Sequence, residues 1–166
     1  MSSVETTTPT EIVKSIFERL DKRDSEVLSD FGAEDVVEMW PIVGRLQGLK
    51  AVGDHFAAIF AAVPDFHIEI ERMAADGETV FAHWHATGTF TGEPFLGIEA
   101  TGRPIDIRGT DCFTIRDGKV VANFIAYDGM TFAVQAGVLP PHGSPLDHAM
   151  TVALNLVTRG RKLVQR

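Results

Sequence analysis

Two runs of alternating side chains meet at the dipeptide Asp117-Gly118. Residues 105–115 precede this dipeptide and residues 120–127 follow it. Asp-Gly between alternating apolar positions is a strong signal for a two-residue β-hairpin turn. The two runs are therefore predicted to be neighbouring antiparallel strands, with Arg116 opposite Lys119 and each further pair one residue farther from the turn on both strands.

The rest of the chain adds helices and further strands before this hairpin. Helical spacing of apolar residues predicts helices from about Thr8 or Thr10 to Leu20, over 25–31 and over 48–62, and Gly32 is a natural stop for the second. Alternation predicts strands over 36–40, 66–73 and 79–91, and a short helix is expected near 130–136. Helices first and long antiparallel strands afterwards indicate an α+β fold, in which a curved sheet carries helices against one face.

Length, charge and cysteine content limit what such a chain does. Its 166 residues suit one domain, and its net charge of −8 repels phosphate backbones, so nucleic acid is not expected as a partner. The single cysteine, Cys112, excludes an internal disulfide framework and a multi-cysteine zinc site. The polar N-terminus does not resemble a signal peptide, and no apolar run approaches the ~20 residues of a membrane span. A cytoplasmic protein without membrane contact is therefore expected.

The hairpin register assigns one face of each strand to the core. On the incoming strand this face carries Gly109 and Asp111, and the register places Ala126 opposite Gly109 and Asp128 on the same inward parity. Two side chains this small leave unfilled space unless a ligand or helix enters it. An isolated buried carboxylate is costly and tends to pair or to change its pKa. The sequence therefore predicts a pocket with two acids, about 13 Å apart at ~3.3 Å per residue.

Each of these features also has a purely structural interpretation. Asp111 could be a carboxylate that a helix N-terminus or buried hydroxyl groups satisfy. Asp128 directly precedes Gly129 and the expected short helix, which it could cap. Gly109 could mark a bulge in a bent sheet instead of a cavity.

Residues 88–141 resemble the SnoaL-like polyketide cyclases, a family with the cone-shaped α+β fold of the nuclear-transport-factor-2-like proteins. The resemblance rests on Gly88-Thr89, Gly92, Thr101-Gly102-Arg103-Pro104, Asp117-Gly118-Lys119, Asp128, Gln135-Ala136-Gly137 and Leu139-Pro140. It extends more weakly over about 9–141, so 1–8 is expected to be a flexible tail and 142–166 a helical extension. The implied fold is a cone-shaped, curved antiparallel sheet with helices packed on its concave face.

The resemblance implies a cofactor-free acid/base reaction on a hydrophobic small molecule. In the family, the Asp that ends the last long strand serves intramolecular aldol ring closure, which corresponds to Asp128 here. The position of Asp111 lines the family's pocket, where a neutral carboxyl would donate to a substrate carbonyl, and the distance between the acids suits a polycyclic substrate. The residues expected to contact substrate are Trp40, Phe56, Phe60, Trp84, Phe90, Phe95, Gly109, Phe124 and Ala126.

Other functions stay open at this point. Asp128 could activate water, as in the epoxide hydrolases and dehydratases of the same fold, or the cone could bind a hydrophobic metabolite without catalysis. Phe90 and Phe124 stand where the family often has His and Trp, which favours an apolar pocket. A metal site at His83 and His85 is disfavoured because their parity is opposite to that of the apolar residues around them, so neither a metal nor a cofactor is expected.

Two surfaces of the predicted fold indicate contacts with other molecules or with a second copy of the chain. On the predicted register, the outward face of the last strand is too apolar for water, which indicates a homodimer through the outer face of the sheet. This face carries Val121, Asn123, Ile125 and Tyr127. A helix with an apolar stripe and a basic end is expected from Ser144-Pro145 to about Arg159. It is expected to pack on the domain or across a dimer, with a pocket lid or an anionic surface contact as alternatives.

Overall fold

The computed structural model describes residues 7–24 and 26–164. Residues 1–6 of the predicted tail, residue 25 of the predicted second helix and residues 165–166 of the predicted extension lie outside the described residues. The elements in chain order are α1 (Pro9–Asp21), α2 (Val27–Phe31), β1 (Gly32–Trp40), β2 (Gly44–Gln47), α3 (Leu49–Ala62), β3 (His67–Asp76), β4 (Thr79–Thr89), β5 (Pro104–Arg116), β6 (Lys119–Tyr127), α4 (Gly129–Gln135) and α5 (Pro145–Val164). The helices and strands expected from the sequence are present, and the short strand β2 was not predicted.

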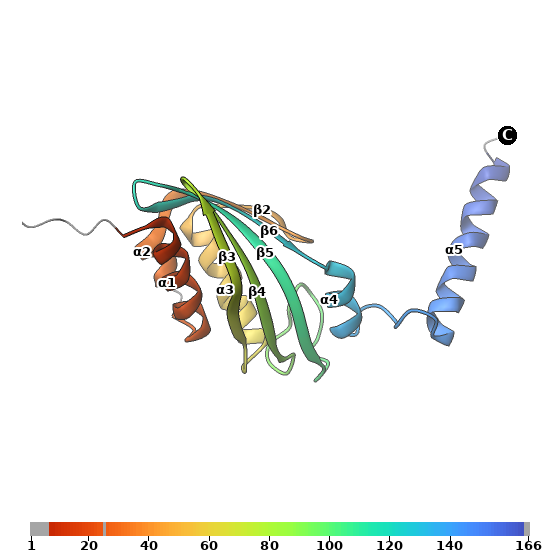
Figure 1. The fold of residues 1–166 in the computed structure, drawn as a ribbon. Coiled ribbons are helices and arrows are strands. Elements are labelled where there is room, and N and C mark those ends of the chain that lie inside the picture. Colours follow the sequence, from red (N-terminus) through yellow and green to blue (C-terminus); the bar gives the residue numbers. More distant parts are fainter. Residues whose placement is uncertain (1–6, 25, 165–166) are drawn as a thin grey trace, which may run out of the picture.

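A six-stranded sheet in the order β2-β1-β6-β5-β4-β3 forms one layer of the molecule (Figure 1). The sheet is curved and open, and α1, α2 and α3 lie together on one side of it (Figure 1). Neighbouring strands pair antiparallel except β1 and β6, which run parallel. The predicted α+β class is confirmed, with this one parallel pair as a departure from the wholly antiparallel sheet expected.

The first helix shows how the sequence builds the covering layer. The Thr8 hydroxyl accepts a hydrogen bond from the Glu11 amide, and the Glu11 carboxylate accepts one from the Thr8 amide at 2.7 Å. This reciprocal capping box, with Pro9 in the first turn, fixes where α1 begins. One face of the helix is then buried and faces β3 and β4, and it consists of Ile12, Val13, Ile16, Phe17 and Leu20.

A β-bulge near the Asp117-Gly118 turn changes the predicted register of the hairpin. Arg116 faces Lys119 as predicted, but the register shifts between Thr114 and Ile115, so Gly109 lies opposite Tyr127 and not Ala126. Because side chains alternate along a strand, this slip by one residue turns the rest of β6 over.

The inward and outward faces predicted for β6 are therefore wrong. Asn123 and Ile125 are buried and Tyr127 is half-buried, whereas Phe124 is 59% exposed on the outer face. The outward patch predicted from Asn123, Ile125 and Tyr127 does not exist. An apolar row takes its place on the outer face, with three exposed members and the half-buried Cys112. Each member is the cross-strand neighbour of the next, in the order Met39, Phe124, Cys112 and Phe81. A dimer through this face stays a prediction.

The last helix stands apart from the domain. After α4, residues 136–144 lead to α5, which continues to Val164, beyond its predicted end near Arg159. Figure 1 shows α5 separated from the sheet and from the other helices. Among residues 7–24 and 26–164, no helix is both long and apolar enough to cross a membrane.

Candidate functional site

A cavity of about 140 Å³ lies between the covering helices and the inner face of the sheet. Its walls are mostly apolar and come from α1, α3 and the inner sides of β1, β4, β5 and β6. The ionisable or amide side chains in its lining are Glu38, His55, Asp111, Asn123 and Tyr127. An apolar cavity with a few polar groups is the usual form of a small-molecule site.

Three buried polar side chains form a row along the sheet side of this cavity. Glu38, Asn123 and Asp111 are exposed by 5%, 4% and 8%, and they come from β1, β6 and β5. Glu38 lies opposite Asn123 in the register of β1 and β6. The Asn123 Nδ2 donates to Asp111 Oδ2 at 2.9 Å, so the amide is a neighbour of both carboxyl groups.

An indole N–H is bonded to each of the two carboxyl groups. The Trp40 Nε1 donates to Glu38 Oε2 at 2.7 Å, and the Trp84 Nε1 donates to Asp111 Oδ1 at the same distance. Trp84 is the cross-strand neighbour of Gly109, where a Cβ would collide with the six-membered ring of the indole. The predicted hollow at Gly109 is therefore filled by Trp84, and the missing side chain lets this indole reach Asp111.

Burial brings the pKa values of both carboxyl groups close to neutral pH. The pKa of Glu38 is raised to about 7, mainly by burial and also by the charge of Asp111, while hydrogen bonds from Trp40 and Asn123 act in the opposite direction. Burial also raises the pKa of Asp111 to about 6, against hydrogen bonds from Asn123 and Trp84. At pH 7 the ionised form of Asp111 thus dominates, while Glu38 is present in both forms. This is the range in which a carboxyl group both accepts and returns protons efficiently.

Asn123 has an unsatisfied group in this row. Its Oδ1 is buried and has no hydrogen-bond partner among the residues that the structure describes. Buried acceptors in proteins are nearly always paired, so a donor is needed here. Protonated Glu38, which lies opposite Asn123 on the neighbouring strand, and a hydroxyl group of a bound ligand are suitable donors.

Aromatic side chains form part of the cavity lining. The ring of His55 on α3 packs edge-on against Trp40, with centroids 4.5 Å apart, and lies 5.8 Å from Phe95. Burial lowers the pKa of His55, so its ring is neutral at pH 7. Burial raises the pKa of Tyr127, which keeps its phenol protonated as a hydrogen-bond donor.

The structure brings together part of the predicted site. Asp111 lines the cavity, as do four of the predicted aromatic residues, namely Trp40, Phe56, Trp84 and Phe95. Phe60 packs against Phe56 and Phe66 outside the lining, and Phe90 belongs to a separate small cluster with Ala62, Ile105 and Ala136. The contacts predicted for Phe124 and Ala126 are wrong, because the bulge turns both side chains to the outer face.

Asp128 lies outside the cavity and caps α4. Its carboxylate accepts hydrogen bonds from the amides of Met130 and Thr131 at 2.9 and 3.1 Å and from the Thr131 hydroxyl at 2.6 Å. These bonds, those from Thr131 first, lower the pKa of the exposed carboxyl group. The inward orientation predicted for Asp128 is wrong and the capping interpretation is confirmed. Its predicted catalytic role thereby loses the geometric argument on which it rested.

Glu38 was not among the predicted site residues, although the sequence carries a signal for it. Glu38 shares the parity of Val36 and Trp40 in the strand predicted over 36–40, so it had to point inward with them. Asn123 and Tyr127 had no comparable signal, because the bulge that turns them inward is not visible in the Asp-Gly turn.

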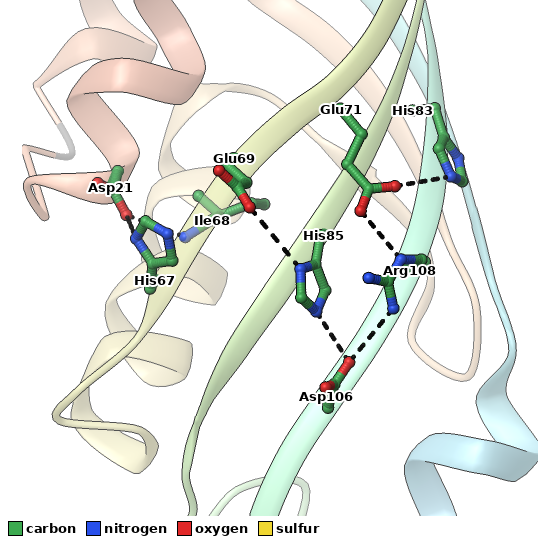
Figure 2. Close-up of polar contacts among 9 residues, drawn as sticks. All are labelled: Asp21, His67, Ile68, Glu69, Glu71, His83, His85, Asp106 and Arg108. Atoms are coloured by element: carbon green, nitrogen blue, oxygen red, sulfur yellow. Dashed lines mark hydrogen bonds and ion pairs between the residues drawn. The ribbon is translucent and has the colours of Figure 1, made fainter.

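The two histidines considered for metal binding belong to an ionic network on the outer face of the sheet. Figure 2 shows basic and acidic side chains alternating there across three strands: His83, His85, Arg108, Glu69, Glu71 and Asp106. The His85 Nε2 lies 2.8 Å from Asp106 Oδ1, and the Arg108 Nε lies 3.0 Å from Glu71 Oε1. Among the described residues, no group of three or more His, Cys, Asp or Glu side chains is arranged to hold a metal ion.

Three comparisons relate this fold to known proteins. The profile of the SnoaL-like polyketide cyclases matches residues 11–136, whereas no curated protein matches the chain. A proposed SnoaL-like polyketide cyclase from Jannaschia sp. CCS1 is 20% identical, with a TM-score of 0.73 over 84% of this chain and 99% of its own. AclR, a proposed hydroxylase from Streptomyces galilaeus, is 17% identical, with a TM-score of 0.71 over 92% and 96% of the two chains.

A third similar structure carries a different description. It is a protein with a ketosteroid isomerase-like fold from Catenulispora acidiphila, 19% identical, with a TM-score of 0.66 over 83% of this chain and 100% of its own. At these identities the solved structures establish the fold, and the profile match over most of the chain establishes the family. The chain belongs to the SnoaL-like polyketide cyclase family.

Proposed function

We propose that the protein is a cofactor-free acid/base enzyme that moves a proton at the carbon beside a carbonyl group of a hydrophobic small molecule. The observation that carries this proposal is the buried pair of Glu38 and Asp111 in the lining of an apolar cavity. Two carboxyl groups with pKa values near neutral pH in an apolar cavity are typical of acid/base catalysis.

The hydrogen bonds assign different roles to the two acids. Asp111 has a donor on each oxygen, which favours its ionised form and leaves it without a free proton site. The hydrogen bond from Trp40 engages Glu38 Oε2 at 2.7 Å and the interaction with Asn123 affects the Glu38 pKa less, so we infer that the second carboxyl oxygen exchanges the proton. We assign proton transfer to Glu38, whose pKa is raised first by burial and to a smaller extent by the charge of Asp111.

The reaction then balances without a cofactor. The Glu38 carboxylate takes the proton from the carbon, and the electron pair left behind forms an enolate, to which Tyr127 donates a hydrogen bond. In an isomerisation, protonated Glu38 returns the proton to another carbon. In a ring closure, the enolate attacks a second carbonyl of the same molecule, and Glu38 gives the proton to the alkoxide that forms. The family's name favours the second outcome.

The cavity size indicates the part of the substrate that enters. A cavity of about 140 Å³ resembles in volume the ~150 Å³ engineered cavity that binds benzene, so it holds one ring. Leu96 lines the cavity and is 45% exposed, which places the mouth at the loop between β4 and β5. A polycyclic substrate, as first expected from the sequence, would extend through this mouth.

The test is the conversion of cyclohex-3-enone to conjugated cyclohex-2-enone, followed by ultraviolet absorbance. This substrate has one ring and needs only a proton transfer. The wild-type protein is expected to accelerate the reaction, with a rate that rises as pH increases through about 7 because the base must be ionised. Glu38→Gln is expected to abolish the acceleration, and Glu34→Gln, which replaces an exposed acid of the same strand, is expected to retain it.

Two other results would assign a different function. Quenching of tryptophan fluorescence by cyclohex-3-enone without turnover would identify a binding protein, an alternative that the apolar lining favours. Hydrolysis of cyclohexene oxide that depends on Glu38 would show that this group activates water. Equal turnover by the wild-type protein and Glu38→Gln would refute the proposed mechanism.

A further inference from the structure

The helix α5 exposes a broad apolar face that none of the residues described by the structure covers. All its side chains from Thr151 to Lys162 are exposed, and its larger apolar residues are exposed by 46–66%. These are Leu146, Met150, Val152, Leu154, Leu156 and Val157. A helix of 20 residues gains little stability in water without packing partners, so a face of this kind indicates an absent one.

The spacing along this face is that of a helix pair. Leu146, Met150, Ala153, Val157 and Gly160 follow one another at intervals of four and three residues. This repeat averages 3.5 residues, which is the spacing of the residues in contact between the two helices of a coiled coil. We call this row of five residues the seam. Leu154 and Leu156 flank the seam, one on each side, and widen the contact surface.

The sizes of the seam residues select an antiparallel partner of the same sequence. In that arrangement Met150 faces Gly160 of the second copy and Ala153 faces Val157, so each large side chain meets a small one. A parallel pair would instead place Gly160 against Gly160 and Ala153 against Ala153, which leaves voids in the seam. A helix-interior glycine is normally unfavourable, and the close approach of Met150 would explain this one.

The charges and the flanking leucines select the same arrangement. Residues that flank the seam on the same side meet across an antiparallel pair, so Asp147 near the start of one helix faces Arg161 near the end of the other. In this register Leu154 meets Leu154 of the second copy, and Leu156 meets Leu156 of the second copy, at the centre of the pair. Opposite charges thus meet at both ends and apolar side chains meet in the middle.

We propose that α5 pairs with α5 of a second copy of this chain as an antiparallel two-helix coiled coil. A lipid surface fits less well, because interfacial helices carry basic residues along their polar face. Here the polar face carries His148, Thr151 and Asn155 for most of its length, and the basic residues are confined to the last turns.

Cross-linking tests the arrangement in the full-length chain. With Cys112→Ser removing the only native cysteine, single cysteines are introduced and treated with a short bismaleimide. Leu154→Cys is expected to cross-link to a dimer, because residue 154 meets itself. Met150→Cys is expected to stay monomeric on a denaturing gel, since the two copies of residue 150 lie about 15 Å apart along the axis at ~1.5 Å per residue. The double variant Met150→Cys/Gly160→Cys is expected to cross-link.

Controls separate this interface from its alternatives. Asn155→Cys on the polar face is the matched control and is expected not to cross-link. In sedimentation equilibrium, Leu154→Glu is expected to raise the dimer dissociation constant at least tenfold, whereas a dimer held by the outer sheet face would not respond. Cross-linking of Met150→Cys alone would show a parallel pair and overturn the proposal. A monomeric wild-type protein would also overturn it, as would one that binds vesicles with 30% anionic lipid as a monomer.

Discussion

Replacing Glu38 by Gln should stabilise the protein at alkaline pH. Gln has nearly the shape of Glu, and its carbonyl oxygen can accept the Trp40 N–H that Glu38 Oε2 accepts at 2.7 Å. Its amide can donate to Asn123 Oδ1, the buried acceptor that has no partner among the described residues. The variant therefore keeps the local packing and removes only the charge.

The magnitude follows from the pKa of Glu38, which burial raises from 4.5 to about 7. At ~1.4 kcal/mol for each pH unit, this difference corresponds to about 3 kcal/mol. Since the folded pKa lies above the unfolded one, the protonated group favours folding below pH 4.5, and this stability is lost as pH rises through 7. Glu38→Gln avoids the loss, so its free energy of unfolding should exceed that of the wild-type protein by up to about 3 kcal/mol at pH 8 and match it near pH 4.

Urea unfolding, followed by tryptophan fluorescence between pH 4 and 8, measures this difference. The wild-type protein is the reference at each pH, because Asp111, whose pKa is also raised, titrates in both proteins. Glu34→Gln is the matched control on the same strand and should give no pH-dependent difference, since Glu34 is exposed. If the curves of Glu38→Gln and the wild-type protein stay parallel from pH 4 to 8, Glu38 is not a buried acid and the proposed mechanism loses its base.

Three further substitutions test other parts of the structure. Gly109→Ala should destabilise the protein by about 1–3 kcal/mol in urea unfolding and change its tryptophan fluorescence, because the new methyl group displaces Trp84. Gly53→Ala in α3 is the control: a Cβ meets open space there, so this variant should be neutral or stabilising in the same titration. Asp128→Asn should keep both the cap of α4 and the isomerase activity, and a loss of turnover at unchanged melting temperature would return Asp128 to the mechanism. Asp128→Ala should lower the melting temperature in calorimetry, because the amide and hydroxyl of Thr131 lose their acceptor.

Local signals in the sequence predicted most of the fold. The capping box of Thr8 and Glu11 and the periodic face behind it mark α1, and Asp117-Gly118 marks the central hairpin. These signals act over a few residues, so they are readable without knowledge of the rest of the chain. The parallel contact of β1 with β6 is not readable in this way, because it joins segments about 85 residues apart through tertiary packing.

The candidate site could be predicted only where the parity of a strand was known. Asp111 was placed correctly because its position is counted along a strand whose apolar face is unambiguous. Glu38 was within reach of the same argument, since Val36 and Trp40 fix the parity of its strand. The aromatic residues of the cavity lining were predicted by type alone, and this criterion does not distinguish Phe56 in the cavity from Phe60 behind it.

The choice between the two faces of β6 depends on a competition between the turn and the core. An unbroken hairpin would bury Phe124 and Ala126 and expose Ile125 and Tyr127, whereas the bulge between Thr114 and Ile115 reverses this. The bulge leaves one residue unpaired in the ladder, and burial of Ile125, which is 2% exposed, offsets this loss. The same slip brings Asn123 between the two acids and removes Asp128 from the cavity. The chemistry of the site thus depends on one extra residue beside the turn, Val121 of β6, which the register leaves without a partner on β5.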